Sequence, residues 1–559
     1  MYKLYEGINK EDFMRLWRDT IKVFMRSKIL FFSMVILYFY SIHFTMTYFR
    51  YPLEGSIVTA QLQQALKLSF YLFLVVLFLS YEYYLKFRHH GMEEVLAAVK
   101  YGKKKKTLWC AFFTMTLWIG ILTVTLCICV IIAYSWYGIH DPHGEYRCHI
   151  IQNMIVNVFL IMELGNLMGL FLSKIKKRII AYAIMILVVY LVSPYPERIA
   201  DAQCVAGNYT RSIYPIIECF NIMPLTNTGF DTIAGYGEPL EVPRISLILF
   251  WIACFCLLIC LSEKCKKWKI TFCSIAAIIL FYGYAAPASV VNMNGNPDHT
   301  MAHDQYYYEA SSETKTKNKK ANYHITSYNM DLKIGRLLKA KVTMEVSKSL
   351  KQYPMTLYHG YRINRICDQS GNDLDYVQKG DYITINNQWG KEIKKISVEY
   401  KGYSAAYYSN HQGIYLPGDF AYYPREGYIP LHDDEQMAMS SCFVRKDTKF
   451  KVKLDYGKKV YTNLPETKGV YEGKCDGFTI FSGFYKEKKF GNGNRLIYNY
   501  LYGECYLDGG IDEICKSDEK SLEEIHKQGV TIFVAPNVNQ MRNRDIGDRQ
   551  ILLRNSPWF

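Results

Sequence analysis

Seven stretches in the first 291 residues carry few or no charged side chains. A helix that crosses a bilayer needs about 20 mostly apolar residues. The pattern therefore predicts seven membrane-spanning helices, of which the second and fifth have the shortest uncharged runs. In chain order they are Ile29–Phe49, Leu66–Tyr84, one within Thr107–Ile139, Ile151–Ser173, Ile179–Pro196, Ile245–Ser262 and Ile270–Val291.

Basic residues gather in every second connection between these predicted spans. Short loops that are rich in Lys and Arg stay in the cytoplasm. We therefore expect a multi-pass cell-membrane protein with a cytoplasmic N-terminus and an extracytoplasmic C-terminal half. Because the first apolar run starts only at Ile29, we expect it to be a signal anchor and not a cleaved signal peptide. The basic clusters are Arg26/Lys28, Lys103–Lys106, Lys174–Arg178 and Lys264–Lys269.

The net charge of +15 is largely explained by these loops, which meet anionic lipid, so nucleic-acid binding is not expected. Residues 1–28 hold an apolar series at helical spacing, which includes Phe13, Trp17 and Phe24, and a basic stripe on another face. The pattern predicts an amphipathic helix in the cytoplasmic membrane interface. The alternative is a basic leader that only helps orientation.

A second short helix is predicted over 93–99, after Gly91 and between the second and third spans. Glu93 and Glu94 stand at its start, where a helix dipole favours acids, and Leu96 gives it an apolar side. A short amphipathic helix in this position is typical of a docking element for a soluble partner. The alternative is a solvated loop.

This layout resembles the permease of a type-2 ABC transporter. The resemblance covers roughly residues 8–262, with the permease domain over 29–262, and adds a seventh span and exit over 263–296. It implies an exporter in which Gly91, Glu93, Glu94 and Leu96 couple the membrane domain to a cytoplasmic ATPase. No phosphate-binding G-x-x-x-x-G-K-[ST] loop occurs in the sequence, so ATP and Mg²⁺ are expected in the partner ATPase and no cofactor in this chain. The resemblance also implies a homodimer or heterodimer of permeases.

Polar residues interrupt the fourth predicted span. Helical spacing puts Glu163 near Asn166 and pairs Asn153 with Asn157. An ionisable group at membrane depth is a functional-site hypothesis by default. Hydrogen bonding between helices is the alternative.

In the C-terminal half, apolar and polar residues alternate instead of forming long uncharged runs. After a lysine-rich linker over 297–321, short alternating segments separated by turns predict a β-sandwich over 322–519. The fold class is thus an α-helical polytopic membrane domain followed by an all-β ectodomain. The predicted strands lie in 323–335, 339–350, 354–368, 381–386, 394–403, 451–461, 477–485, 496–501, 530–535 and 550–553, with a helix over 520–528.

The segment GIYLPGDFAYYPREGYIPL, residues 413–431, together with the strand order resembles the N-terminal domain of the aminopeptidase N family of zinc metallopeptidases. Tyr422 stands where that family usually has Trp. Tyrosines in this half are candidates for an exposed contact surface, or else are ordinary strand residues. The surface candidates are Tyr415, Tyr422, Tyr423 and Arg425.

Peptidase chemistry is not expected, because no H-E-x-x-H zinc motif occurs among the 13 histidines. Residues 520–559 resemble the start of a peptidase domain. No metal site is expected; the run from His432 to Glu435 is a weak cation candidate or a solvated loop.

Of the 16 cysteines, Cys204/Cys219 and Cys505/Cys515 are disulfide candidates by spacing alone.

These observations favour a non-enzymatic permease subunit of an ABC exporter that moves a peptide, lipid or antimicrobial-type cargo. Two alternatives stay open. One is a non-transporting sensor or immunity protein whose ectodomain binds an extracellular peptide. The other, disfavoured by the missing zinc motif, is a membrane-anchored peptidase.

Overall fold

The computed structural model divides into two compact units, one helical and one β-rich. The helical unit comprises residues 1–53, 57–227 and 240–286, and the β-rich unit comprises 54–56, 228–239 and 287–559. The structure describes residues 10–47, 57–89, 91–98, 104–136, 141, 144–193, 195–196, 216–217, 219–224, 235–263, 265–285, 307–308, 319–388, 390, 392–404, 407–433, 438–490, 493–502, 528–534 and 544–553.

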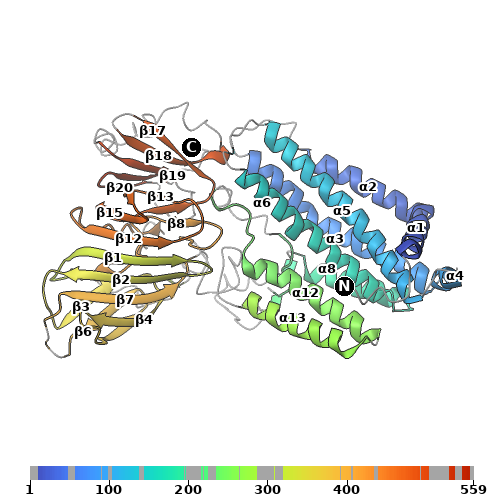
Figure 1. The fold of residues 1–559 in the computed structure, drawn as a ribbon, viewed down its shortest axis with the longest axis horizontal. Coiled ribbons are helices and arrows are strands. Elements are labelled where there is room, and N and C mark those ends of the chain that lie inside the picture. The colour runs from blue at the N-terminus through green and yellow to red at the C-terminus, as the bar shows by residue number, and fades with distance from the viewer. Residues whose placement is uncertain are drawn as a thin grey trace. The chain divides into compact units, whose positions relative to one another are not determined.

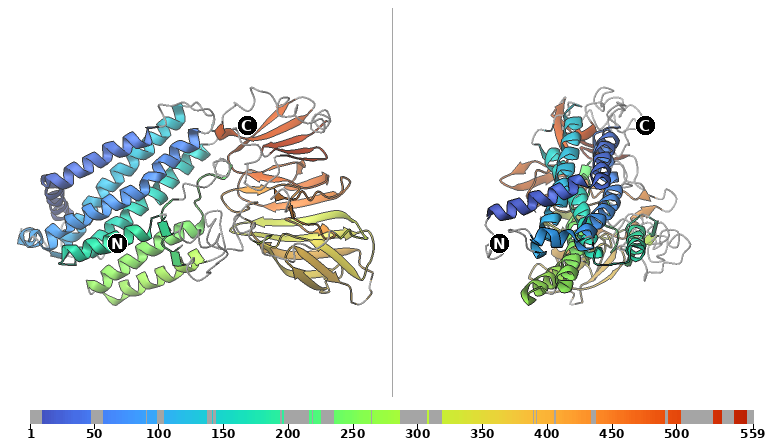
Figure 2. Two further views of the ribbon diagram at one scale, coloured as in Figure 1. Left: turned by 180° about the vertical axis from the view of Figure 1, so that it is seen from behind. Right: turned by 90° about the vertical axis from the view of Figure 1, so that its right-hand side faces the viewer.

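The helical unit is built from long helices that run side by side, and the short helix α4 lies between α3 and α5 along the chain (Figures 1 and 2). The central packing is that of α3 against α5 and α7, and of α12 against α7 and α13. In chain order the elements are α1 (Lys10–Arg26), α2 (Lys28–Thr45), α3 (Ile57–Arg88), α4 (Met92–Ala98), α5 (Lys104–Trp136), α6 (Glu145–Asn153), the π-helix η3 (Met154–Phe159), α7 (Leu160–Leu172), α8 (Arg178–Leu191), α12 (Val242–Ser262) and α13 (Lys267–Ala285).

Six helices of this unit are long and apolar enough to cross a membrane. They are α2, α3, α5, the continuous run α6–η3–α7, α12 and α13, and they match six of the seven predicted spans. The protein is therefore a multi-pass membrane protein by the length and composition of its helices. Apolar side chains that face outward from the bundle, such as Ile36, Phe272 and Ile278, are those that lipid would cover.

The fifth predicted span is the helix α8, which has 14 residues. At 1.5 Å per residue it is about 21 Å long, shorter than the roughly 30 Å of a bilayer core. It begins beside the end of α3, where Arg178 and Tyr182 contact Glu82. The chain then reaches the first half of α12, where Trp251 donates to the carbonyl of Cys219. The helix α8 is therefore shorter than the predicted span Ile179–Pro196.

The predicted N-terminal amphipathic helix is α1. Its buried side chains Leu16, Thr20 and Phe24 are spaced four residues apart. Phe24 stacks on Trp118 of α5 with ring centroids 5.6 Å apart, and the carbonyl of Thr20 accepts a hydrogen bond from Tyr83 of α3. The basic stripe faces outward: Arg15, Arg18, Lys22 and Arg26 are exposed.

The β-rich unit contains several sheets and not the two of a simple sandwich (Figure 1). A seven-stranded sheet has the order β14-β15-β12-β1-β2-β7-β4, antiparallel except for the parallel pair β1 and β12. Its strands are β1 (Ile325–Ile334), β2 (Leu338–Val346), β4 (Tyr361–Asp368), β7 (Lys395–Gly402), β12 (Lys449–Asp455), β14 (Glu466–Thr467) and β15 (Val470–Lys474).

Four smaller sheets complete the described part of this unit. The predicted strand over 354–368 is two strands in different sheets, β3 and β4, because the chain turns at His359 and Gly360. The smaller sheets are β5-β6-β3-β9, β13-β16-β8, β10-β11 and β17-β18-β19-β21-β20. Their strands are β3 (Gln352–Thr356), β5 (Asp375–Lys379), β6 (Tyr382–Asn386), β8 (Ile414–Leu416), β9 (Arg425–Glu426), β10 (His432–Asp433), β11 (Ala438–Met439), β13 (Tyr461–Thr462), β16 (Ile480–Ser482), β17 (Tyr485–Phe490), β18 (Asn494–Asn499), β19 (Thr531–Val534), β20 (Arg544–Gly547) and β21 (Gln550–Leu553).

Tyrosine is a main component of the core of the β-rich unit. Tyr328, for example, stacks on Phe450 with ring centroids 5.1 Å apart, and its hydroxyl donates to the carbonyl of Pro424. The ring of Tyr328 thus removes apolar surface from water while its hydroxyl stays hydrogen-bonded. Several predictions fall on residues that the structure does not describe: the helix over 520–527, most of the linker, Asp434, Glu435, Cys204, Cys505 and Cys515.

Candidate functional site

The short helix α4 lies between α3 and α5 and packs on both. Gly91 precedes it with φ of +73°, a conformation that glycine adopts without steric cost. The carbonyl of Gly91 accepts from the amides of Glu94 and Val95, both at 3.0 Å. Leu96 is buried, whereas Glu94 is exposed and Val95 is 61% exposed. The predicted helix is present with an apolar and an outward face; the side chain of Glu93 is outside the described part.

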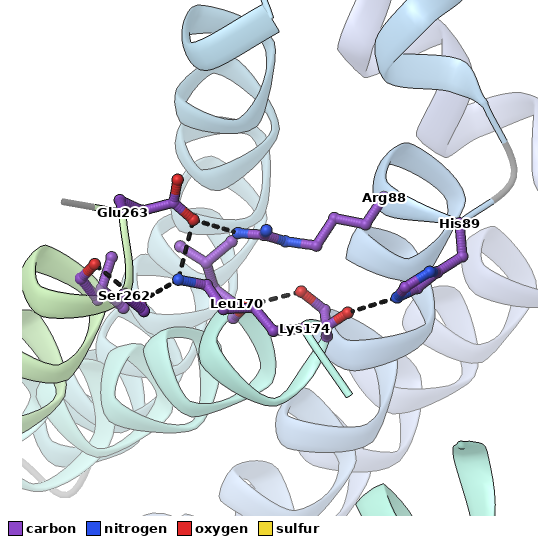
Figure 3. A network of polar contacts seen from close by, with 8 residues as sticks. Arg88, His89, Leu170, Lys174, Ser262 and Glu263 are labelled. Carbon is purple, nitrogen blue, oxygen red and sulfur yellow. Dashed lines mark hydrogen bonds and ion pairs between the residues drawn. The ribbon is translucent and has the colours of Figure 1, made fainter. Parts of the chain in front are cut away.

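A cluster of charged residues joins the ends of three helices close to α4 (Figure 3). Glu263, which follows α12, accepts from Arg88 of α3 at 3.0 Å and from Lys174, which follows α7, at 2.9 Å. Lys174 also contacts Ser262, and the ring of His89 lies 3.0 Å from the carbonyl oxygen of Ser173. We call Arg88, Lys174 and Glu263 the charged cluster, and the end of the unit that holds it the basic end.

The charged cluster keeps Glu263 ionised. Burial by itself raises the pKa of this carboxyl, but hydrogen bonds and charge from Lys174 and Arg88 outweigh burial and hold the pKa below its usual value. Two cations share one carboxylate, so the three helix ends are held together by ionic hydrogen bonds. Sequence analysis used Lys174 only to orient the protein and did not single out Arg88 or Glu263, because their meeting depends on the packing of α3, α7 and α12.

The predicted intramembrane pair forms within the helical unit. Glu163 is 7% exposed, and its Oε2 accepts from Nδ2 of Asn166 at 3.1 Å. Oδ1 of Asn166 accepts from the hydroxyls of Ser80, at 3.2 Å, and Tyr84, at 2.5 Å, both on α3. The pair is thus connected to the neighbouring helix, which the sequence left open.

Two glycines bring α3 and α7 close together beside this pair. A Cβ atom on Gly165 would lie 3.1 Å from the backbone oxygen of Phe73, and one on Gly169 would lie 2.7 Å from Cβ of Ser80. Small residues four apart allow membrane helices to approach closely. The close approach is what brings Ser80 and Tyr84 within hydrogen-bonding distance of Asn166.

A second polar network surrounds Arg244, which sequence analysis left outside the sixth span. The guanidinium is buried and donates to Oδ1 of Asn157, at 3.0 and 3.1 Å, and to the carbonyls of Asn221 and Ile222. Asn157 in turn donates to Asn153 at 2.8 Å, which confirms the predicted pair. The signal in the sequence is an arginine three residues into an apolar run.

The predicted tyrosine surface of the ectodomain is wrong. Tyr415, Tyr422 and Tyr423 are fully buried, and Arg425 is 1% exposed. Arg425 donates to the carbonyls of Gly418 and Phe420, and its guanidinium carbon lies 3.7 Å from the ring centre of Tyr423. These residues are core because the segment is covered on both sides, and the hydroxyl of Tyr422 pairs with the carbonyl of Phe478.

No group of three or more His, Cys, Asp or Glu side chains able to hold a metal ion occurs among the described residues. His432 stacks on Tyr308 with ring centroids 4.9 Å apart.

Comparisons with known proteins reveal only distant structural similarity. No protein-family model matches the chain, and no curated protein matches it. Yeast LTA4 hydrolase is similar with a TM-score of 0.31 and 12% identity over 44% of this chain and 43% of the hydrolase. An M1 zinc metallopeptidase from Deinococcus radiodurans is similar with a TM-score of 0.28 and 11% identity over 42% of this chain and 61% of the peptidase. The match spans less than two thirds of either protein.

Proposed function

We propose that the protein is the permease subunit of an ABC exporter, and that a separate cytoplasmic ATPase hydrolyses ATP for it. The observation that carries the proposal is the position and the exposed face of the helix α4. This helix is a short one in the loop between two long apolar helices, it is anchored on them by the buried Leu96, and it presents Glu94 and Val95 outward. An exposed acid beside an exposed apolar side chain is a contact that a soluble partner can bind.

The charged cluster supports the same function, because its long side chains connect the end of α3, which precedes α4, to the ends of α7 and α12. Arg88 lies three residues before Gly91 and is bonded to Glu263, which is bonded to Lys174. A displacement of α4 would therefore act on α3 and α5 directly, and on α7 and α12 through the cluster. Such a connection is what a transporter needs to convert closure of an ATPase into movement of its helices.

In this proposal the basic end faces the cytoplasm, in agreement with the Lys and Arg bias of short loops. ATP and Mg²⁺ bind the partner, this chain hydrolyses nothing, and two permease chains, identical or different, assemble with two ATPase chains. The β-rich unit lies outside the cell and binds, gates or shields a peptide, lipid or antimicrobial-type cargo. The peptidase-like fold expected for that unit is the basis for a peptide as the first cargo to test.

The test is purification of the native complex in mild detergent, with mass spectrometry and an ATPase assay. The double variant E94K/V95S reverses the charge of residue 94 and removes the apolar contact of Val95 on the outward face of α4. We expect it to lose a co-purifying nucleotide-binding protein and its ATPase activity. E145K, an equal change of charge at an exposed residue of α6, should retain both.

Two results would contradict the proposal. If wild-type protein purifies with no nucleotide-binding partner, the chain is not an ABC subunit. If a partner is present and added peptide stimulates its ATPase without movement of any cargo into vesicles, the sensor alternative is correct.

A further inference from the structure

Glu163 is a buried carboxyl group whose two oxygens have different surroundings. Oε2 accepts the 3.1 Å hydrogen bond from Asn166. Oε1 is buried, and it has no hydrogen-bond partner among the described residues. No ion pair involving Glu163 is found in the described part of the chain either, in contrast to Glu263, which has two.

The orientation of Asn166 is fixed by its other contacts. Its Oδ1 accepts from Tyr84 and Ser80, so Oδ1 faces α3 and Nδ2 faces Glu163. The amide therefore supplies one neutral donor to the carboxyl and cannot supply a second. The phenol of Tyr84 on α3, which donates to Asn166, is a titratable group close enough to interact electrostatically with Glu163.

The hydroxyl of Thr116 on α5 is the remaining polar group that interacts with Glu163. Its Oγ1 is buried and forms no hydrogen bond of ordinary geometry within the described residues. Elsewhere on α5, Thr114 and Thr123 donate to the carbonyl four residues earlier at 2.9 Å. Thr116 forms no such bond to its own helix, so the lone pairs of its Oγ1 are available to accept.

An ionised carboxylate at this position would be a buried charge with one neutral donor and no cation, which is costly inside a membrane. A proton on Oε1 removes the charge and turns Oε1 into a donor. That O–H group has an acceptor in Thr116, and Oε2 keeps the hydrogen bond from Asn166. Every polar atom of the group is then paired after a small shift of the Glu163 or Thr116 side chain, because the two oxygens do not form a hydrogen bond of ordinary geometry in the structure.

We propose that Glu163 is a proton-binding site that joins α7 to α5 inside the membrane. When α5 packs on α7, Glu163 holds a proton on Oε1 and donates to Thr116. When the two helices separate and water enters, the proton leaves to water and the carboxylate is hydrated. The proposal goes beyond transport and holds for any multi-pass protein with this bundle, so its failure and the failure of the ABC function are separate results.

The test uses the infrared spectrum of the full-length protein in lipid nanodiscs at pH 7, where exposed carboxyls with pKa of about 4 are ionised. A protonated carboxylic acid has a carbonyl stretch that carboxylates lack and that shifts in D₂O. We expect the wild-type minus E163Q difference spectrum to contain this band. The wild-type minus E263Q spectrum should lack it, because the charged cluster keeps Glu263 ionised.

If the wild-type minus E163Q spectrum contains no such band, Glu163 is ionised and the proposal is wrong. T116V provides a second variant. Valine has nearly the shape of threonine, so the T116V protein should fold even if the E163Q protein does not. The carbonyl band should still be present in T116V, but at a different frequency, because the O–H group loses its acceptor. An unshifted band in T116V would overturn the link to α5.

Discussion

The side-chain amide of Asn410 donates a hydrogen bond of 3.0 Å to the hydroxyl of Tyr236, 174 residues earlier in the chain. Gln412 adds two more from its own amide, to the carbonyls of Tyr236 and Glu238, both at 2.9 Å. The segment with Tyr236 thus belongs to the core of the β-rich unit, although α12 of the helical unit begins only at Val242.

Replacement of Gln412 by alanine should destabilise the β-rich unit. Two buried carbonyls would lose their donor, and an unpaired buried polar group costs about 1–3 kcal/mol. The measurement is urea unfolding of the purified full-length protein, followed by tyrosine fluorescence. Q352A is the matched control, because Gln352 is exposed and its amide bonds only to the side chain of Asn386. An equal unfolding midpoint for Q412A and Q352A would contradict the assignment.

Gly169→Ala should loosen the packing of α3 on α7. The new Cβ would lie 2.7 Å from Cβ of Ser80 and 2.9 Å from the backbone nitrogen of Tyr81, and forcing such contacts costs about 1–3 kcal/mol. We expect a lower thermal unfolding midpoint in detergent. Gly120→Ala is the control, since its Cβ would approach nothing nearer than 4.0 Å. If both variants unfold at the same temperature, the close approach is not needed.

Arg425→Met separates a core role from a surface role. The carbonyls of Gly418 and Phe420 would lose a buried donor, so we expect a destabilisation of about 2–4 kcal/mol in urea unfolding. A surface residue would instead change binding and leave stability within about 0.5 kcal/mol. R445M, at an exposed arginine of the same unit, is the control that should show the smaller effect.

Asp476 should make the stability of the β-rich unit depend on pH. Burial raises the pKa of this carboxyl to about 6, although Gln550 and the amide of Asp548 favour its ionised form. Because the folded state holds the proton more tightly than the unfolded chain, stability is greatest below pH 4. The stability falls by at most about 3 kcal/mol in total as the pH rises to about 6, and it is constant at higher pH.

The measurement is the urea midpoint of wild type and D476N at pH 4, 5, 6 and 7. Asparagine has no proton to lose, so the fall between pH 4 and 6 should be smaller in D476N. D447N is a matched control at an exposed position and should keep the wild-type slope. Parallel slopes for wild type and D476N would show that another group titrates.

Local patterns predicted much of the fold because they depend on neighbours in sequence. Apolar runs of about 20 residues can be buried only in lipid or protein, and they located six long helices. Helical spacing of three and four residues paired Glu163 with Asn166 and Asn153 with Asn157, and both pairs form. Alternation at period two located most of the long strands.

Alternation of apolar and polar residues along a strand does not reveal whether one or both faces of the strand are buried by the rest of the chain. The sequence left Tyr422 and Tyr423 as candidates for a contact surface or as ordinary strand residues, and both are core. Their burial depends on strands that follow much later in the chain: the hydroxyl of Tyr422 donates to the carbonyl of Phe478 at 2.6 Å.

The sequence by itself determined most of the long helices and strands, six of the segments that are apolar enough for a membrane, and which polar residues share a helix face. These properties depend on side-chain chemistry and on spacings of two to four residues. Only the tertiary structure decided that Glu263 meets Arg88 and Lys174, that Arg244 meets Asn157, and that Asn166 meets Ser80 and Tyr84. Such contacts depend on which helices pack together and at what depth, and no short-range spacing encodes that arrangement.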